Sequence, residues 1–108
     1  MSLQTFLEKQ VGKKIYRVNN ILAERILRDA ASRPPAGFAD IVIVELPEGF
    51  KNARDVALRV IPAANPEGSI LVLSRWFYTD VVEKEQSLLP ENAKSAKRPR
   101  GYVTIKIG

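Results

Sequence analysis

The sequence contains no cysteine and no histidine. Without these residues there are no disulfides, no thiolate nucleophile and no imidazole base, and the usual structural zinc sites are excluded. Carboxylate, lysine or hydroxyl chemistry and an oxygen-liganded magnesium or calcium ion remain open, but the residues show no recognisable arrangement of that kind. We therefore expect a protein that is not an enzyme and that holds no metal and no cofactor.

Long apolar runs are also missing. No run approaches the roughly 20 residues that a membrane-spanning helix needs. Residues 1–14 lack the continuous apolar stretch of a secretory signal. We expect a protein without a membrane partner that resides in the cytoplasm, or in a particle assembled there.

The composition is that of an ordinary folded protein. The chain has 108 residues, of which 45% are hydrophobic and 27% are charged. This length fits one domain with a modest hydrophobic core, and we see no internal repeat or low-complexity tract. The sequence therefore predicts a single domain over residues 1–108.

Positive charge is concentrated at both ends of the chain. The formal net charge is +5; residues 1–33 carry a net +4, residues 34–72 a net −2 and residues 73–108 a net +3. Two basic ends suit an anionic partner if they meet in space. That partner is either nucleic acid or an acidic protein surface.

The first half of the chain shows helical and strand patterns. Residues 3–11 have the apolar spacing of a short amphipathic helix. Residues 14–18 combine β-branched and aromatic side chains and favour a strand. A helix near residues 20–32 follows, with Asn19 or Asn20 as its N-cap. One continuous helix through both segments is the alternative reading.

The second half is dominated by strand patterns. Residues 53–62 have alternate apolar positions at Val56, Leu58 and Val60, and the turn formers at residues 65–68 favour an antiparallel return. A short helix is expected at residues 81–89. The expected strands are residues 14–18, 41–44, 53–62, 69–78 and 102–107.

These elements predict an α+β domain. We expect a mainly antiparallel sheet of four or five strands with two or three helices, of which the helix near residues 20–32 packs on one face. The order of the elements is close to a ferredoxin-like split βαβ fold with an extra strand.

A basic segment precedes the last strand and supplies candidate contacts for an anion or a nucleic acid. Positive charge within reach of phosphates and an aromatic ring for stacking are what such a site requires. A solvated loop and a contact to an acidic protein are the alternatives. The candidate residues are Lys94, Lys97, Arg98, Arg100, Tyr102 and Lys106.

The same segment partly resembles the strand that binds bases in RNA-recognition motifs. Arg100, Gly101 and Tyr102 fit the start of that strand, but Val103 stands where Gly or Ala is required and Thr104 where an aromatic residue is required. The sequence therefore does not predict an RNA-recognition motif.

The densest aromatic cluster is "SRWFY" at residues 74–78. Trp and Tyr are common in protein interfaces as well as in cores. Trp76 is our candidate anchor for a protein interface, with a place in the core as the alternative.

Two functions from different classes follow from these observations. The first is a non-enzymatic structural or interaction subunit that docks into a larger protein assembly, such as a virion or a similar machine. Its partners would be other protein subunits, with a homo-oligomer as one form. The alternative is a basic nucleic-acid-binding accessory protein.

Overall fold

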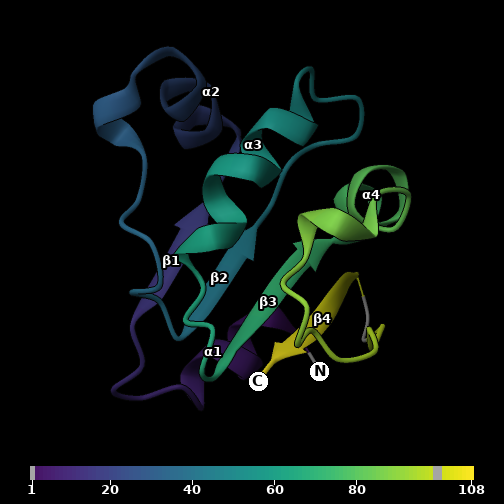
Figure 1. Ribbon diagram of the computed structural model, residues 1–108. Helices are drawn as coiled ribbons and strands as arrows, with labels where there is room; N and C mark the ends of the chain where they lie inside the picture. Colours follow the sequence, from purple (N-terminus) through teal and green to yellow (C-terminus); the bar gives the residue numbers. More distant parts are fainter. Residues whose placement is uncertain (1, 99–100) are drawn as a thin grey trace.

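The computed structural model describes residues 2–98 and 101–108 and shows an α+β fold with helices on both sides of a four-stranded sheet (Figure 1). The main elements are α1 (Leu3–Glu8), β1 (Ile15–Val18), α2 (Asn20–Arg28), β2 (Ile41–Val44), α3 (Ala53–Val60), β3 (Ser69–Ser74), α4 (Arg75–Phe77) and β4 (Tyr102–Ile107). Short helical turns lie at Ala30–Ser32, Ile61–Ala63, Tyr78–Val82 and Gln86–Leu88.

The four strands lie in the order β1-β2-β3-β4. β1, β2 and β3 run parallel, with Ile41 paired to Ile15 on one side and to Ile70 on the other. β4 runs antiparallel to β3, with Ile107 opposite Ser69. The sheet is thus mixed and mostly parallel, so the prediction of a mainly antiparallel sheet is wrong.

The cause of this difference is the segment expected as a strand at residues 53–62. Its first eight residues form α3, which leaves Leu58 47% exposed. The buried positions of α3 recur at helical spacing and are Ala53, Val56, Ala57 and Val60. Since α3 is a crossover between β2 and β3, those strands can run parallel, which a tight hairpin would not allow.

The ferredoxin-like arrangement is excluded by the pairing of the strands. β1 is bonded directly to β2, and β2 directly to β3. In a split βαβ unit, another strand lies between the two parallel strands that the helix connects. The connections β1-α2-β2 and β2-α3-β3 are instead two successive, unsplit βαβ units.

The last third of the chain also departs from the expected pattern. The strand expected at residues 69–78 ends at Ser74, where the chain passes directly into α4. Phe77 and Tyr78 are consecutive and both buried, which a helical segment allows and an alternating strand does not. The helix expected at residues 81–89 is replaced by this earlier segment and a separate 3₁₀ turn.

Two local predictions near the N-terminus are confirmed. The helix at the start of the chain is α1, whose cap Ser2 accepts a hydrogen bond from the backbone N–H of Thr5 at 3.1 Å. Asn19 caps α2, because its Oδ1 accepts a hydrogen bond from the backbone N–H of Leu22 at 2.9 Å. Such side-chain acceptors satisfy N–H groups that a helix start leaves unpaired.

The main core lies between the sheet and the layer of α2, α3 and α4, while α1 lies on the other side (Figure 1). The prediction that the helix after residue 20 packs on one face is confirmed, since α2 buries Ala23 and Ile26 there. Large side chains from the sheet and from α2, α3 and α4 meet in this core, among them Ile26, Val42, Val56, Leu71, Phe77 and Ile105.

Candidate functional site

The two faces of the sheet are covered unequally. On one face, three helices and the turns that follow them bury the main core. On the other face, within residues 2–98 and 101–108, the covering element is the six-residue α1, none of whose residues is buried. We call this second side the open face, and its central side chains are Ile41, Ile43, Ile70, Val72, Tyr102, Thr104 and Lys106.

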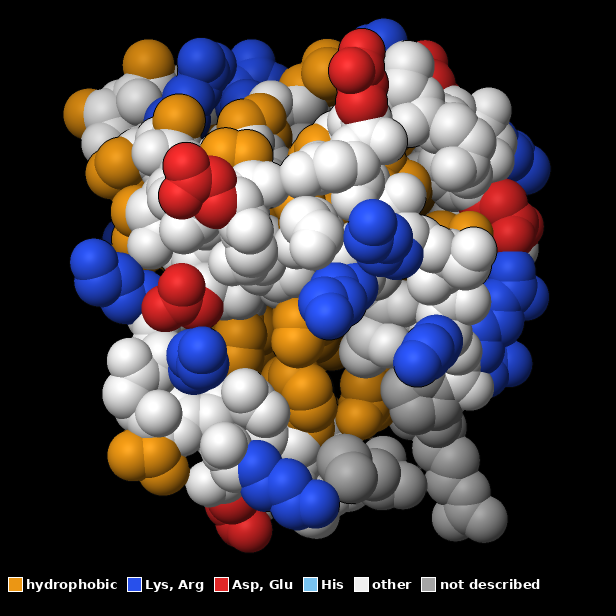
Figure 2. Space-filling view, turned by 60° about the horizontal axis from the view of Figure 1, so that its bottom comes forward, with side chains coloured by type: hydrophobic (Ala, Val, Ile, Leu, Met, Phe, Trp, Pro, Cys, Tyr) orange, Lys and Arg blue, Asp and Glu red, His pale blue; other side chains and the backbone are white. Residues whose placement is uncertain are grey.

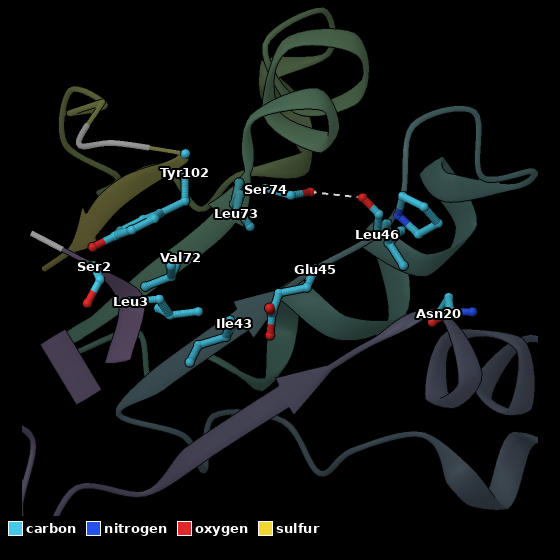
Figure 3. A pocket seen from close by; sticks show the side chains of 12 residues that line it. Ser2, Leu3, Asn20, Ile43, Glu45, Leu46, Val72, Leu73, Ser74 and Tyr102 are labelled. Atoms are coloured by element: carbon cyan, nitrogen blue, oxygen red, sulfur yellow. Dashed lines mark hydrogen bonds between the residues drawn. The ribbon is translucent and has the colours of Figure 1, made fainter. Parts of the chain in front are cut away.

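A first groove, of about 790 Å³, lies on the open face at the carboxyl ends of β2 and β3. We call it the strand-end groove. In Figure 3, Leu3 of α1 reaches over Ile43 and Val72, so the floor is apolar. In sheets with parallel strands, ligands commonly bind outside these carboxyl ends. Glu45, which follows β2, and Ser74, the last residue of β3, line the groove there.

The polar side chains of the strand-end groove are largely engaged within the protein. The hydroxyl of Ser74 donates to the backbone carbonyl of Leu46 at 3.1 Å. Glu45 forms an ion pair with Arg17 of β1, and its hydrogen bond raises the pKa of the Arg17 guanidinium. Glu45 is the acidic side chain among the groove's described lining residues, and it pairs with Arg17 while the Ser74 hydroxyl donates to Leu46, so this arrangement offers contact surface rather than an activated nucleophile.

A second groove, of about 500 Å³, lies on the other side of α1 beside β4. We call it the lysine groove. Lys94, Lys97 and Lys106 line it together with the apolar side chains of Phe6 and Ile70. Figure 2 shows hydrophobic side chains at the floor of a hollow with Lys and Arg side chains around it. The lysine groove thus combines a positive rim with an apolar floor.

Backbone hydrogen bonds fix the segment that carries two of these lysines. The N–H of Lys94 donates to the carbonyl of Lys106 at 2.8 Å. Lys97 and Thr104 exchange two hydrogen bonds, of 2.9 and 2.8 Å. The segment therefore pairs with β4 as an irregular extra strand, and Lys97 shares the open face with Thr104, since residues directly opposite on paired strands point to the same side.

Four of the six residues that the sequence singled out thus line one groove: Lys94, Lys97, Tyr102 and Lys106. Arg98 is directed elsewhere, because its guanidinium donates to the carboxylate of Glu83 at 2.6 Å and lies 5.4 Å from the centre of the Tyr78 ring. Arg100 lies outside the described residues.

The two aromatic candidates differ in position. Tyr102 is only 8% exposed and packs against Ile43 and Val72 under α1. Trp76 is half-buried and packs against the main core on the opposite side of the sheet. The structure therefore places Trp76 away from both grooves, and its role as an interface anchor stays a prediction.

The residues of α1 and β3 that complete the lysine groove were not among the predicted site residues. Phe6 comes from α1 and Ile70 from β3, and both are half-buried. The alternation in residues 102–107 was the available signal, since it places Thr104 and Lys106 on the face opposite the buried Val103, Ile105 and Ile107. No pattern in the sequence near β4 predicts that a helix from the other end of the chain covers this face.

No group of three acidic side chains within residues 2–98 and 101–108 could hold a metal ion. No helix in the same residues is long and apolar enough to cross a membrane. No protein-family model matches the sequence and no curated protein is significantly similar to it.

Proposed function

We propose that this protein is a non-enzymatic interaction subunit that docks a partner protein on the open face of its sheet. The observation that carries the proposal is the cover of this face by one six-residue helix with a groove on either side. Apolar surface rimmed by polar residues is characteristic of protein interaction sites. A partner segment bound in either groove would lie beside α1 and cover more of the open face.

The available side chains favour binding over catalysis. A hydrolytic or transfer reaction needs an activated nucleophile, a general base or a metal ion. In the strand-end groove, the hydroxyl of Ser74 and the carboxylate of Glu45 are occupied by partners within the chain. The proposal places this subunit in the cytoplasm or in a particle assembled there.

A nucleic-acid-binding accessory protein is the second candidate, because Lys94, Lys97 and Lys106 gather on one groove. Lysines beside an aromatic ring can bind phosphates and stack a base. The ring in this groove is that of Tyr102, and at 8% exposure it presents little surface to stack on. This observation favours a protein partner.

Site-specific photo-crosslinking in the cell that makes the protein tests the proposal. We would place p-benzoylphenylalanine at Ser95 or Thr104, which line the lysine groove, or at Glu24 or Arg28, which are exposed on α2 on the opposite side. We expect defined protein adducts from the groove positions and none from the α2 positions.

The adduct then has to be shown to bind the groove. The crosslinked protein is identified by mass spectrometry, purified and titrated against the wild type and Thr104→Trp, which places a bulky uncharged side chain in the groove. We expect the variant to lose affinity while Glu24→Trp keeps it. Adducts of similar yield from both sides of the sheet, or adducts that nuclease rather than protease removes, would count against the proposal.

A further inference from the structure

The three lysines of the lysine groove carry positive charge that the described chain does not neutralise. Among residues 2–98 and 101–108, the ion pairs are Arg17–Glu45, Arg54–Glu85 and Arg98–Glu83, and none of them includes a groove lysine. No acidic side chain is among the groove's lining residues in the part of the chain that the structure describes. Anionic groups on a ligand would therefore meet uncompensated cations.

The floor of the groove adds an apolar requirement. Phe6 and Ile70 lie under the lysines and are half-buried, so part of each side chain still faces the groove. Apolar area that is removed from water stabilises a complex by roughly 25 cal/mol per Å². A ligand that carries only charge would leave this contribution unused, whereas one with an apolar side chain between its charges would gain it.

The backbone that carries the three lysines is already paired within the protein. Hydrogen bonds from Lys94 to Lys106 and between Lys97 and Thr104 hold their backbone along β4. A backbone that is already ordered lowers the entropic cost of binding, although the lysine side chains still have to be ordered by the ligand.

We infer that the lysine groove binds an acidic segment of the partner protein, in which carboxylates flank an apolar side chain. The carboxylates contact Lys94, Lys97 and Lys106, and the apolar side chain packs on Phe6 and Ile70. The inference rests on the proposed function of the open face as a protein docking surface, and it names the chemistry of the docked segment.

A second copy of this chain is a poor source of such a segment. Its most acidic stretch is residues 80–91. In that stretch, Glu83 is paired with Arg98 and Glu85 with Arg54. Both carboxylates would have to leave their partners to reach the groove of another copy.

Fluorescence anisotropy with the full chain tests the inference. The probe is a fluorescein-labelled peptide with the central sequence Glu-Glu-Leu-Glu-Glu and Gly-Ser flanks. One control peptide has Gln for each Glu and another has Ser for Leu. We expect the acidic peptide to bind, the Gln peptide to bind at least tenfold more weakly, and the Ser peptide to bind at least fivefold more weakly.

Two neighbouring substitutions make a matched pair of variants. Lys97→Gln and Arg98→Gln remove the same charge from adjacent positions, but only Lys97 lines the groove. We expect Lys97→Gln to weaken the peptide about threefold and the triple variant with Lys94→Gln and Lys106→Gln to weaken it about tenfold or more. Arg98→Gln should change the affinity by less than twofold.

Several outcomes would overturn the inference. Equal losses from Lys97→Gln and Arg98→Gln would show attraction to net charge only, and equal binding of the Ser peptide would show that the apolar floor is unused. Tighter binding of a labelled ten-nucleotide thymidine strand, with the same dependence on Lys97, would assign the groove to nucleic acid. If no peptide binds while protein crosslinks still form at Ser95 and Thr104, the docking function stands and the acidic segment is wrong.

Discussion

Lys97 and Thr104 are joined by a reciprocal pair of backbone hydrogen bonds: the N–H of Lys97 donates to Thr104 at 2.9 Å and the N–H of Thr104 donates back at 2.8 Å. This pair attaches the basic segment to the outer edge of β4, the last strand of the sheet. Exposed sheet edges are prone to unwanted pairing, and covering them is a common protection. The same contact holds Lys97 over the open face.

The first prediction tests this pairing. Lys97→Pro removes the N–H that Thr104 binds and forces the ring into the paired segment. We expect the free energy of unfolding to fall by about 1–3 kcal/mol, measured by urea denaturation. Lys97→Gln keeps the backbone donor and should stay within about 0.5 kcal/mol of the wild type. Similar values for the two variants would show that the pairing contributes nothing to stability.

The second prediction separates the helix at α3 from the strand that the sequence suggested. Val60 is fully buried and Leu58 is 47% exposed. We expect Val60→Ala to lower the free energy of unfolding by about 2 kcal/mol, from two lost methyl groups and the cavity they leave. Leu58→Ala should change it by less than about 0.5 kcal/mol. In a strand, both residues would lie on one face and the two losses would be alike.

This pair of residues also shows why the sheet direction was not predictable from the strand pattern. Val56, Leu58 and Val60 alternate as in a strand, while the helical signal depends on Ala53 and Ala57. Alanine occurs in cores and on surfaces alike, so Ala53 and Ala57 only weakly indicate the helical spacing of apolar residues. If residues 53–60 form a strand, no helix connects β2 to β3. The predicted sheet was mainly antiparallel for this reason.

The candidate site was predictable to the extent that it depends on neighbours in sequence. The alternation in residues 102–107 is observed, and Lys97 and Arg98 point to different sides of the sheet as adjacent residues of an extended segment do. The position of Phe6 was not predictable, because it depends on packing between opposite ends of the chain. Helices as short as α1 are set by such tertiary contacts rather than by their own sequence.

The third prediction concerns the helix cap that the sequence left open between two asparagines. Asn19 Oδ1 accepts a hydrogen bond from Leu22, whereas Asn20 is the first residue of α2. Asn19→Ala should lower the free energy of unfolding by about 1 kcal/mol. Asn20→Ala should change it by less than about 0.5 kcal/mol. Thermal unfolding followed by circular dichroism measures the stability of both variants. A larger loss from Asn20→Ala than from Asn19→Ala would place the cap at Asn20.

The last prediction depends on a buried hydroxyl. The Tyr16 Oη has no hydrogen-bond partner within residues 2–98 and 101–108, and the ring packs edge-on against Phe38 with their centres 5.6 Å apart. Burial of Tyr16 raises the pKa of its phenol above the ordinary value of 10.0. A buried polar group without a partner is costly, so Tyr16→Phe should leave the free energy of unfolding at neutral pH unchanged or raise it by up to about 1 kcal/mol.

The pH dependence has a definite sign. Above pH 10 the phenol of the unfolded chain loses its proton, while the folded chain keeps it because its pKa is higher. The unfolded state then binds fewer protons, so the stability of the wild type falls as the pH rises through this window. Tyr16→Phe lacks this loss, and its advantage over the wild type should grow above pH 10. Urea denaturation at pH 7, 9, 10 and 11 measures the difference, and parallel pH profiles for the two proteins would show that Tyr16 titrates equally in both states.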